Sequence, residues 1–151
     1  MFKTEDRDTL IQNLLDREEI RNLALKYAHY VWQGKADEWV DLYAEDAMIS
    51  SEHPDRPTSR GHDSLRALFN EVASTSKPRP FVHNHVVNLL GPSEATGTCY
   101  SEVRISIDGK NGLVVGVYDD RYRKVDGVWK FAERKSTIEY FGPANEYRVP
   151  E

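Results

Sequence analysis

The chain has 151 residues, which is the length of one domain and enough to bury a hydrophobic core. Hydrophobic residues make up 39% of it and charged residues 30%, and no apolar run is long enough to span a bilayer, so we expect neither a membrane span nor a membrane partner. The net charge of −5, with Lys and Arg scattered along the chain, argues against a nucleic-acid partner.

Two further features concern location and redox chemistry. The first ten residues mix acidic and basic side chains and lack the apolar stretch of a secretory signal, so we expect a cytoplasmic protein. Cys99 has no second cysteine to pair with, and its strand-like surroundings predict a small buried hydrophobic residue rather than a nucleophile.

Helical periodicity dominates the first half of the chain. The apolar residues of the first repeat are Leu10, Ile11, Leu14 and Leu15. The pattern restarts after Asp16, which is predicted to cap a second helix over about residues 17–33 that ends at Gly34. A short helix is predicted over 37–43, and another amphipathic helix includes 65–72.

The second half of the chain has the character of strands separated by turns. The predicted strands are Phe81–Leu90, Ala95–Ile107, Leu113–Lys124 and Val128–Tyr140. The last two flank Asp126 and Gly127, and Asp-Gly is a strong hairpin signal. Long antiparallel strands after a helical block predict an α+β fold.

Several segments together carry a family resemblance. They read R-E-E-I-R-N-L-A-L-K-Y-A at 17–28, W-V-D-L-Y-A-E-D-A at 39–47, F-V-H-N-H-V-V at 81–87, A-T-G-T-C-Y at 95–100 and D-G-V-W-K-F at 126–131. In this order they resemble the nuclear transport factor 2-like superfamily, and within it the SnoaL-like branch that includes scytalone dehydratase and hexachlorocyclohexane dehydrochlorinase.

The resemblance implies one domain over residues 1–151. Its fold would be an α+β cone, a barrel-like arrangement in which N-terminal helices pack in the concavity of a strongly bent, mainly antiparallel sheet. Such cones associate through the outer face of the sheet, so a homodimer or homotrimer is expected.

The resemblance also implies a change in chemistry. In the dehydratase and dehydrochlorinase members, an Asp on the long helix orients a His on the strand that opens the sheet. These positions fall on Trp32 and Pro80, neither of which can act as a base or orient one. Arg134 remains where the dehydrochlorinase-like enzymes hold an Arg. Either the cone serves binding or assembly, or catalysis has moved to other residues.

His83 and His85, on either side of Asn84, are the candidates for a relocated base. Strand alternation puts both on the face opposite position 80, so they line the outer face if Pro80 faces the cone. A bulge between Pro80 and His83 would reverse this. No nearby Cys or carboxylate completes a ligand set with them, so no metal is expected.

Arg134 is predicted to point inward with Ala132 and Ser136, where its charge needs an anionic ligand or an acid such as Glu139. The charged residues on the neighbouring strand are predicted to form an outer face: Asp119, Asp120, Arg121 and Arg123. The predicted site has His83 and Arg134 as catalytic residues. The predicted ligand-binding residues are Tyr27, His29, Trp32, Val82, Asn84 and Tyr118.

The function that follows is an apolar pocket for a small cyclic or aromatic molecule. Whether the protein is an enzyme stays open; if it is, the resemblance implies a lyase or isomerase such as a dehydratase or cyclase that uses no cofactor. The alternative is a ligand-binding protein without catalysis, or an assembly subunit like the small subunit of ring-hydroxylating dioxygenases.

Overall fold

The computed structural model describes residues 6–151. The N-terminal segment that is predicted not to be a secretory signal covers the first ten residues, and five of these lie outside the described residues. The elements, in chain order, are α1 (Arg7–Gln33), α2 (Ala36–Asp41), β1 (Tyr43–Ser51), β2 (Ser59–Arg60), α3 (His62–Ser76), β3 (Arg79–Leu89), β4 (Glu94–Ile107), β5 (Lys110–Val125) and β6 (Val128–Pro143).

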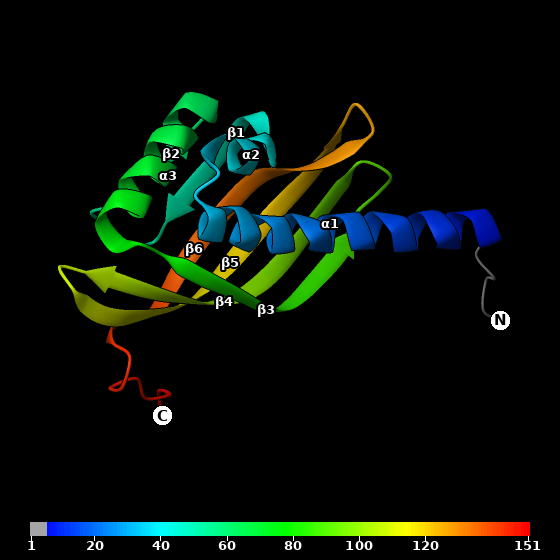
Figure 1. Cartoon of the computed structure of the whole chain (residues 1–151). Coiled ribbons are helices and arrows are strands. Elements are labelled where there is room, and N and C mark those ends of the chain that lie inside the picture. The colour runs from blue at the N-terminus through cyan, green and yellow to red at the C-terminus, as the bar shows by residue number, and fades with distance from the viewer. Residues whose placement is uncertain (1–5) are drawn as a thin grey trace.

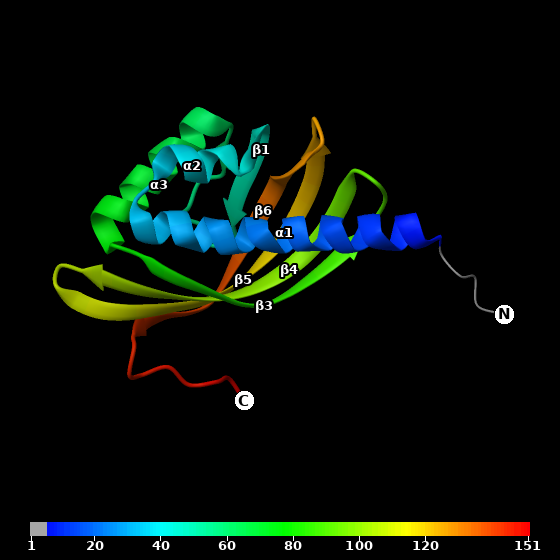
Figure 2. The same ribbon diagram turned by 45° about the vertical axis from the view of Figure 1, so that its right-hand side comes forward.

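The strands form one sheet in the order β2-β1-β6-β5-β4-β3. β1 runs parallel to β6, and the other neighbouring pairs are antiparallel. The sheet bends strongly, and the helices pack on its concave side (Figures 1 and 2). The expected α+β cone is confirmed, with the sheet left open between its edge strands β2 and β3.

α1 is one continuous helix, so the predicted break after Asp16 is wrong. The Asp16 side chain accepts hydrogen bonds from the Trp129 indole Nε1 at 2.9 Å and the Lys124 ammonium at 2.8 Å, and it caps no helix. The predicted end at Gly34 is right: this residue has a left-handed φ of 67°, and its N–H donates to the Val31 carbonyl.

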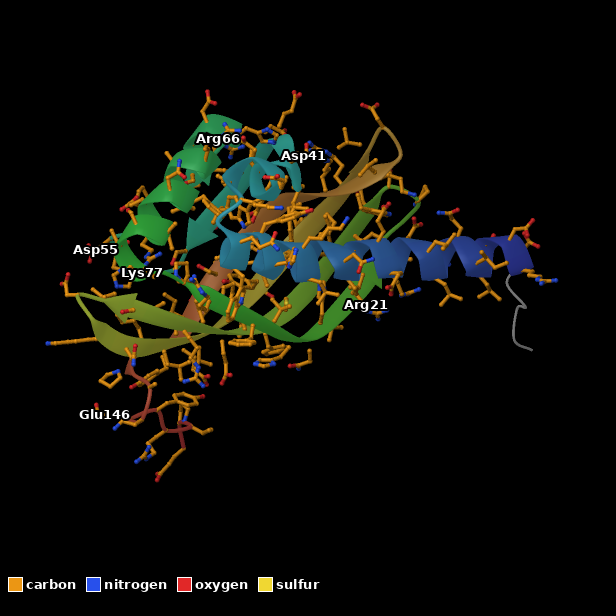
Figure 3. All side chains as sticks on the ribbon, viewed as in Figure 1. Arg21, Asp41, Asp55, Arg66, Lys77 and Glu146 are labelled. Atoms are coloured by element: carbon orange, nitrogen blue, oxygen red, sulfur yellow. The ribbon has the colours of Figure 1, made fainter. Side chains whose placement is uncertain are left out.

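The core lies between the helices and the concave face of the sheet. Its members are Ile20, Leu23, Trp39, Val40, Leu42, Tyr43, Ala44, Ala47, Leu65, Phe69, Val87, Ala95, Tyr122, Trp129 and Phe131. α2 and α3 are also joined at the surface, where the Arg66 guanidinium binds the Asp37 carboxylate at 3.1 Å; Arg66 is labelled in Figure 3. Among the helices of residues 6–151, none is long and apolar enough to cross a membrane.

Candidate functional site

A buried ion pair lies at the centre of the cone. Arg134 on β6 and Asp120 on β5 are cross-strand neighbours, and the guanidinium donates to both carboxylate oxygens, at 2.8 and 2.9 Å. Arg134 is 1% exposed and Asp120 3%. Although burial alone lowers the pKa of Arg134, the neighbouring carboxylate holds it well above its usual value.

The prediction that Asp120 belongs to an outer charged face is therefore wrong. Tyr118, Asp120 and Tyr122 are two residues apart along β5, so strand alternation places all three on one face. Tyr118 is one of the predicted ligand-binding residues of the cone, and the same alternation predicts that Asp120 and Tyr122 lie inside as well. Asp120, rather than Glu139, is the partner of Arg134.

Aromatic rings surround the guanidinium. Its central carbon lies 4.5 Å from the ring centroid of Tyr27, 4.1 Å from that of Tyr118 and 4.5 Å from that of Phe131. The hydroxyls of Tyr27 and Tyr118 are 3.5 Å apart, at the limit of a hydrogen bond. The rings and the carboxylate together hold the cation away from water.

The β6 register determines which ring joins Arg134. A shift between β5 and β6 leaves Ala132 as an extra residue, since Tyr122 pairs with Phe131 and Arg121 with Glu133. Phe131 therefore shares the inner face with Arg134, and the prediction that Ala132 does so is wrong. The sequence offered no signal for this bulge.

His85 extends the ion pair into a row of hydrogen-bonded groups. The Tyr122 hydroxyl donates to Asp120 Oδ2 at 2.8 Å, and His85 Nε2 lies 2.8 Å from the Tyr122 oxygen. Because Tyr122 has given its only proton to the carboxylate, the His85 Nε2–H is the donor in the second bond. In the neutral imidazole the other nitrogen, Nδ1, then carries a free lone pair.

The electrostatics favour this neutral form. Burial lowers the pKa of His85 below the ordinary 6.5, the charges of Arg134 and Arg21 lower it further, and Asp120 opposes them. Two atoms on this row, His85 Nδ1 and Arg134 Nη1, are buried without a hydrogen-bond partner among the described residues. The row therefore presents one free acceptor and one free donor, both oriented through Asp120.

A bulge in β3 brings His85 inside and leaves His83 outside. Val82 pairs with Ser101 and His85 with Cys99, so β3 has one extra residue between these pairs. The prediction that the two histidines share a face is wrong for this reason. His83 is exposed, with Nε2 3.3 Å from a carboxylate oxygen of Glu102.

Gly97 on β4 makes room for the Tyr122 ring. A Cβ at this position would lie 2.9 Å from the Tyr122 hydroxyl and 2.9 Å from the Val86 carbonyl oxygen. Any larger residue would have to displace the ring or the β3 backbone, so glycine at this position keeps Tyr122 between His85 and Asp120.

Trp32 and Pro80 are in direct contact, as the resemblance implies for the two positions. The Trp32 indole Nε1 donates to the Pro80 carbonyl at 2.7 Å. However, Trp32 is 44% exposed and its ring packs against Phe81 and Arg79. The prediction that Trp32 is a ligand-binding residue inside the cone is wrong, because the ring ties the end of α1 to the start of β3 at the rim.

The other predicted ligand-binding residues divide between interior and surface. Tyr27 and Tyr118 surround Arg134, whereas Val82 is only half-buried. His29 and Asn84 are exposed, and the His29 ring lies against Tyr30. Their surface positions follow from the helix face on which His29 lies and from the β3 bulge at Asn84.

Two hollows of the protein lie away from the interior of the cone, where the apolar pocket is expected. One hollow of about 390 Å³ lies over β3 to β6 and is lined by Asn88, Thr96, Gly97, Thr98, Asp119, Asp120, Arg121, Glu133 and Lys135. A second, of about 220 Å³, is bounded by α1, α2 and the start of β6. Inside the cone, the buried side chains of the core occupy the space between the helices and the sheet.

The described residues give little support to catalysis by a thiol or to metal binding. The Cys99 thiol is buried, which raises its pKa to about 11, so it stays protonated near neutral pH. Across residues 6–151, no three or more His, Cys, Asp or Glu side chains come together in a way that would hold a metal ion.

Helices packed in the concavity of a bent six-stranded sheet are also the fold of an NTF2-like protein with a cystatin-like fold from Novosphingobium aromaticivorans, which is 23% identical with a TM-score of 0.77, and 91% of this chain and 92% of that chain are covered. A SnoaL-like domain model matches residues 12–135, most of the chain, and the chain belongs to that family.

Solved structures share this fold along nearly the whole chain. A putative scytalone dehydratase from Novosphingobium aromaticivorans is 20% identical, with a TM-score of 0.80 and 93% of each chain covered. A type 2 hexachlorocyclohexane dehydrochlorinase is 19% identical, with a TM-score of 0.82 and coverage of 93% of this chain and 97% of that one.

A putative aromatic ring hydroxylase from N. aromaticivorans is 23% identical, with a TM-score of 0.77, and 84% of this chain and 91% of that chain are covered. No curated protein matches the sequence. At these identities the likeness concerns the fold.

Proposed function

We propose that the protein binds a small cyclic or aromatic molecule inside the cone and moves a proton on it without a cofactor, in the cytoplasm. The observation that carries the proposal is that two of the four unpartnered buried side-chain atoms of the described residues, Arg134 Nη1 and His85 Nδ1, belong to one hydrogen-bonded row. Buried polar atoms in native proteins are nearly always paired, so two free ones in one connected row support a role toward a ligand.

The two atoms have complementary chemistry. His85 is a neutral imidazole with a free lone pair, which suits a general base that takes a proton from carbon near neutral pH. The electron pair left on the substrate moves onto an oxygen, and the Arg134 Nη1–H donates to that oxygen as its negative charge develops. Proton abstraction of this kind begins dehydrations, isomerisations and cyclisations, the lyase and isomerase reactions expected of this branch.

Ligand entry requires the aromatic rings over Arg134 to separate. The long 3.5 Å contact between the hydroxyls of Tyr27 and Tyr118 is the weakest link of this group, and a ligand oxygen can replace it. The flat ring of a cyclic or aromatic ligand would then stack between the two tyrosines, beside the guanidinium.

Binding is tested with 4-nitrophenol, whose phenolate form is coloured. We expect the protein to favour the bound phenolate and Arg134→Met to weaken binding about tenfold or more, because a charge-assisted hydrogen bond is lost. The matched control is Arg79→Met, which removes an exposed arginine at the rim. If the parent does not bind, or both variants bind as the parent does, the proposal for Arg134 is wrong.

Folding must be measured alongside binding. Arg134→Met leaves Asp120 as a buried carboxylate without its partner, and we expect it to lower the free energy of unfolding by about 3–5 kcal/mol. Arg134→Lys keeps the charge but loses the two-pronged contact, so it separates a loss of binding from a loss of fold.

Proton transfer is tested separately, by following exchange of the α-hydrogens of cyclohexanone in D₂O by NMR. His85→Gln should reduce any protein-dependent exchange by about 10²-fold or more, whereas exposed His29→Gln should not change it. Binding without exchange would leave the cone as a ligand-binding module and remove the base from the proposal.

The second candidate is an assembly subunit that forms a homodimer or homotrimer through the outer sheet face. The exposed side chains of Val86 and Tyr100, 54% and 41% accessible, favour it, together with His83 beside Glu102. Sedimentation of Val86→Glu and His83→Ala tests it: an unchanged mass for both contradicts association through this face.

A further inference from the structure

The first half of α1 has an apolar stripe on the side that faces away from the core. Its members are Leu10, Ile11, Leu14 and Leu15, which are 46%, 45%, 67% and 59% exposed. Asp16 and Ile20, on the opposite side of the helix, are buried against the sheet. The first turns of α1 extend past the end of the sheet in both views (Figures 1 and 2). No element of residues 6–151 covers the stripe.

A basic residue lies before the stripe and an acidic residue lies after it, so two antiparallel copies of the stripe have complementary charges at their ends. Arg7 lies one turn before the stripe, Glu18 one turn after it, and both are exposed. At 100° per residue, both positions fall within about 20° of the centre of the apolar face. The midpoint of the stripe, between residues 12 and 13, is also the midpoint between Arg7 and Glu18.

We propose that a second copy of this chain covers the stripe, with the two α1 helices antiparallel and related by a twofold axis at this midpoint. In that arrangement the apolar side chains of one helix meet those of the other, and Arg7 of each copy faces Glu18 of its partner at both ends. A parallel pair would instead put Arg7 against Arg7 and Glu18 against Glu18. The charges therefore select the antiparallel pair.

This association is independent of the outer sheet face and of the site inside the cone. The stripe residues point away from both, so dimer formation through α1 leaves the Arg134 row unchanged. The contact area of four short side chains per copy predicts a dimer that dissociates on dilution rather than an obligate one.

Sedimentation over a concentration series gives the dimer dissociation constant. We expect the parent to be a reversible dimer and Leu14→Glu to raise the dissociation constant about 100-fold or more, because both copies lose a central apolar contact. Val149→Glu, which alters an equally aliphatic side chain that is 77% exposed in the C-terminal tail, is the matched control and should not change it. A monomeric parent, or a Leu14→Glu variant with the parent's dissociation constant, overturns the proposal.

Charge exchange tests the orientation. Arg7→Glu or Glu18→Arg alone creates two repulsive contacts per dimer and should raise the dissociation constant about 3–30-fold. The double variant restores both contacts and should return it to within about threefold of the parent. Absence of this rescue excludes the antiparallel pairing.

Cross-linking gives a readout that does not depend on apolar residues or on the stability of the variants. An equimolar mixture of R7C and E18C should form a disulfide-linked heterodimer, and neither variant alone should do so, since identical positions lie far apart in the antiparallel pair. Native Cys99 is buried and does not interfere. Disulfides between identical positions would overturn the proposed orientation.

Discussion

Arg134 carries a full charge in an interior built largely of aromatic rings, and Asp120 compensates it through two hydrogen bonds. An isolated guanidinium in such surroundings would be very unfavourable, so the carboxylate is what allows a cation inside the cone. Through Tyr122 the same carboxylate orients His85. One residue thereby fixes the positions of both groups that the proposed chemistry requires.

His85 predicts a specific pH dependence of stability. Its folded pKa lies below the ordinary 6.5, chiefly because of burial. As the pH falls through about 6.5, the unfolded chain takes up a proton at His85 that the folded protein does not. The contribution of His85 to the free energy of unfolding is therefore present in full above this pH and decreases below it. His85→Gln removes this proton uptake and should make the decline in stability shallower.

The measurement is the free energy of unfolding in urea at about pH 8 and about pH 5 for the parent and the variant. His29→Gln is the control, because His29 is exposed and its loss should leave the parent's decline unchanged. An equal decline for the parent and His85→Gln would show that His85 is free to become protonated in the folded protein.

At the scale of elements, Asp16 fastens α1 to the β5–β6 hairpin. It accepts hydrogen bonds from Trp129 and Lys124 near that turn and from Gln12 one helical turn earlier. Burial raises the pKa of Asp16, but these hydrogen bonds and the Lys124 charge outweigh it and lower the pKa overall. The ionised form is therefore the one that holds the helix in place.

We expect Asp16→Ala to lower the free energy of unfolding by about 2–4 kcal/mol, because the buried indole N–H of Trp129 loses its acceptor. Asp16→Asn keeps an acceptor and should cost less, about 1–2 kcal/mol. Asp8→Ala, an exposed change in the first turn of the same helix, is the control for urea denaturation. Equal stability of all three would mean that α1 is held without this contact.

Trp32 connects two elements as well, through Pro80 and Phe81 at the rim. Since the side chain is 44% exposed, an Asp at this position would lie at the surface and not deep in the cone. The residue therefore matters for the junction between α1 and β3 rather than for the shape of a cavity.

For the whole molecule, the helices and the sheet share one core, and this predicts one cooperative unfolding transition. Trp39 on α2 and Trp129 on β6 are both buried in it, 3% and 0% exposed. Their fluorescence reports tertiary packing, whereas far-UV circular dichroism reports the backbone, and the two urea transitions should coincide. Separate midpoints would show that the helical layer unfolds independently of the sheet.

The sequence by itself determined the α+β class, the order of helices before strands, the end of α1 at Gly34 and the inward direction of Arg134. These features depend on local rules: apolar periodicity, the left-handed conformation favoured by glycine, and the alternation of side chains along a regular strand. Family resemblance added the cone and the position of Tyr118 in it.

Only the tertiary structure decided the composition of the site. Single extra residues in β3 and at Ala132 in β6 reversed the alternation locally, which put His85 inside, left His83 outside and placed Phe131 against Arg134. Asp16 became an acceptor for a distant indole instead of a helix cap. A bulge arises from pairing between strands far apart in the sequence, and a buried carboxylate takes whichever donors the packed chain brings to it, so neither can be derived from neighbouring residues alone.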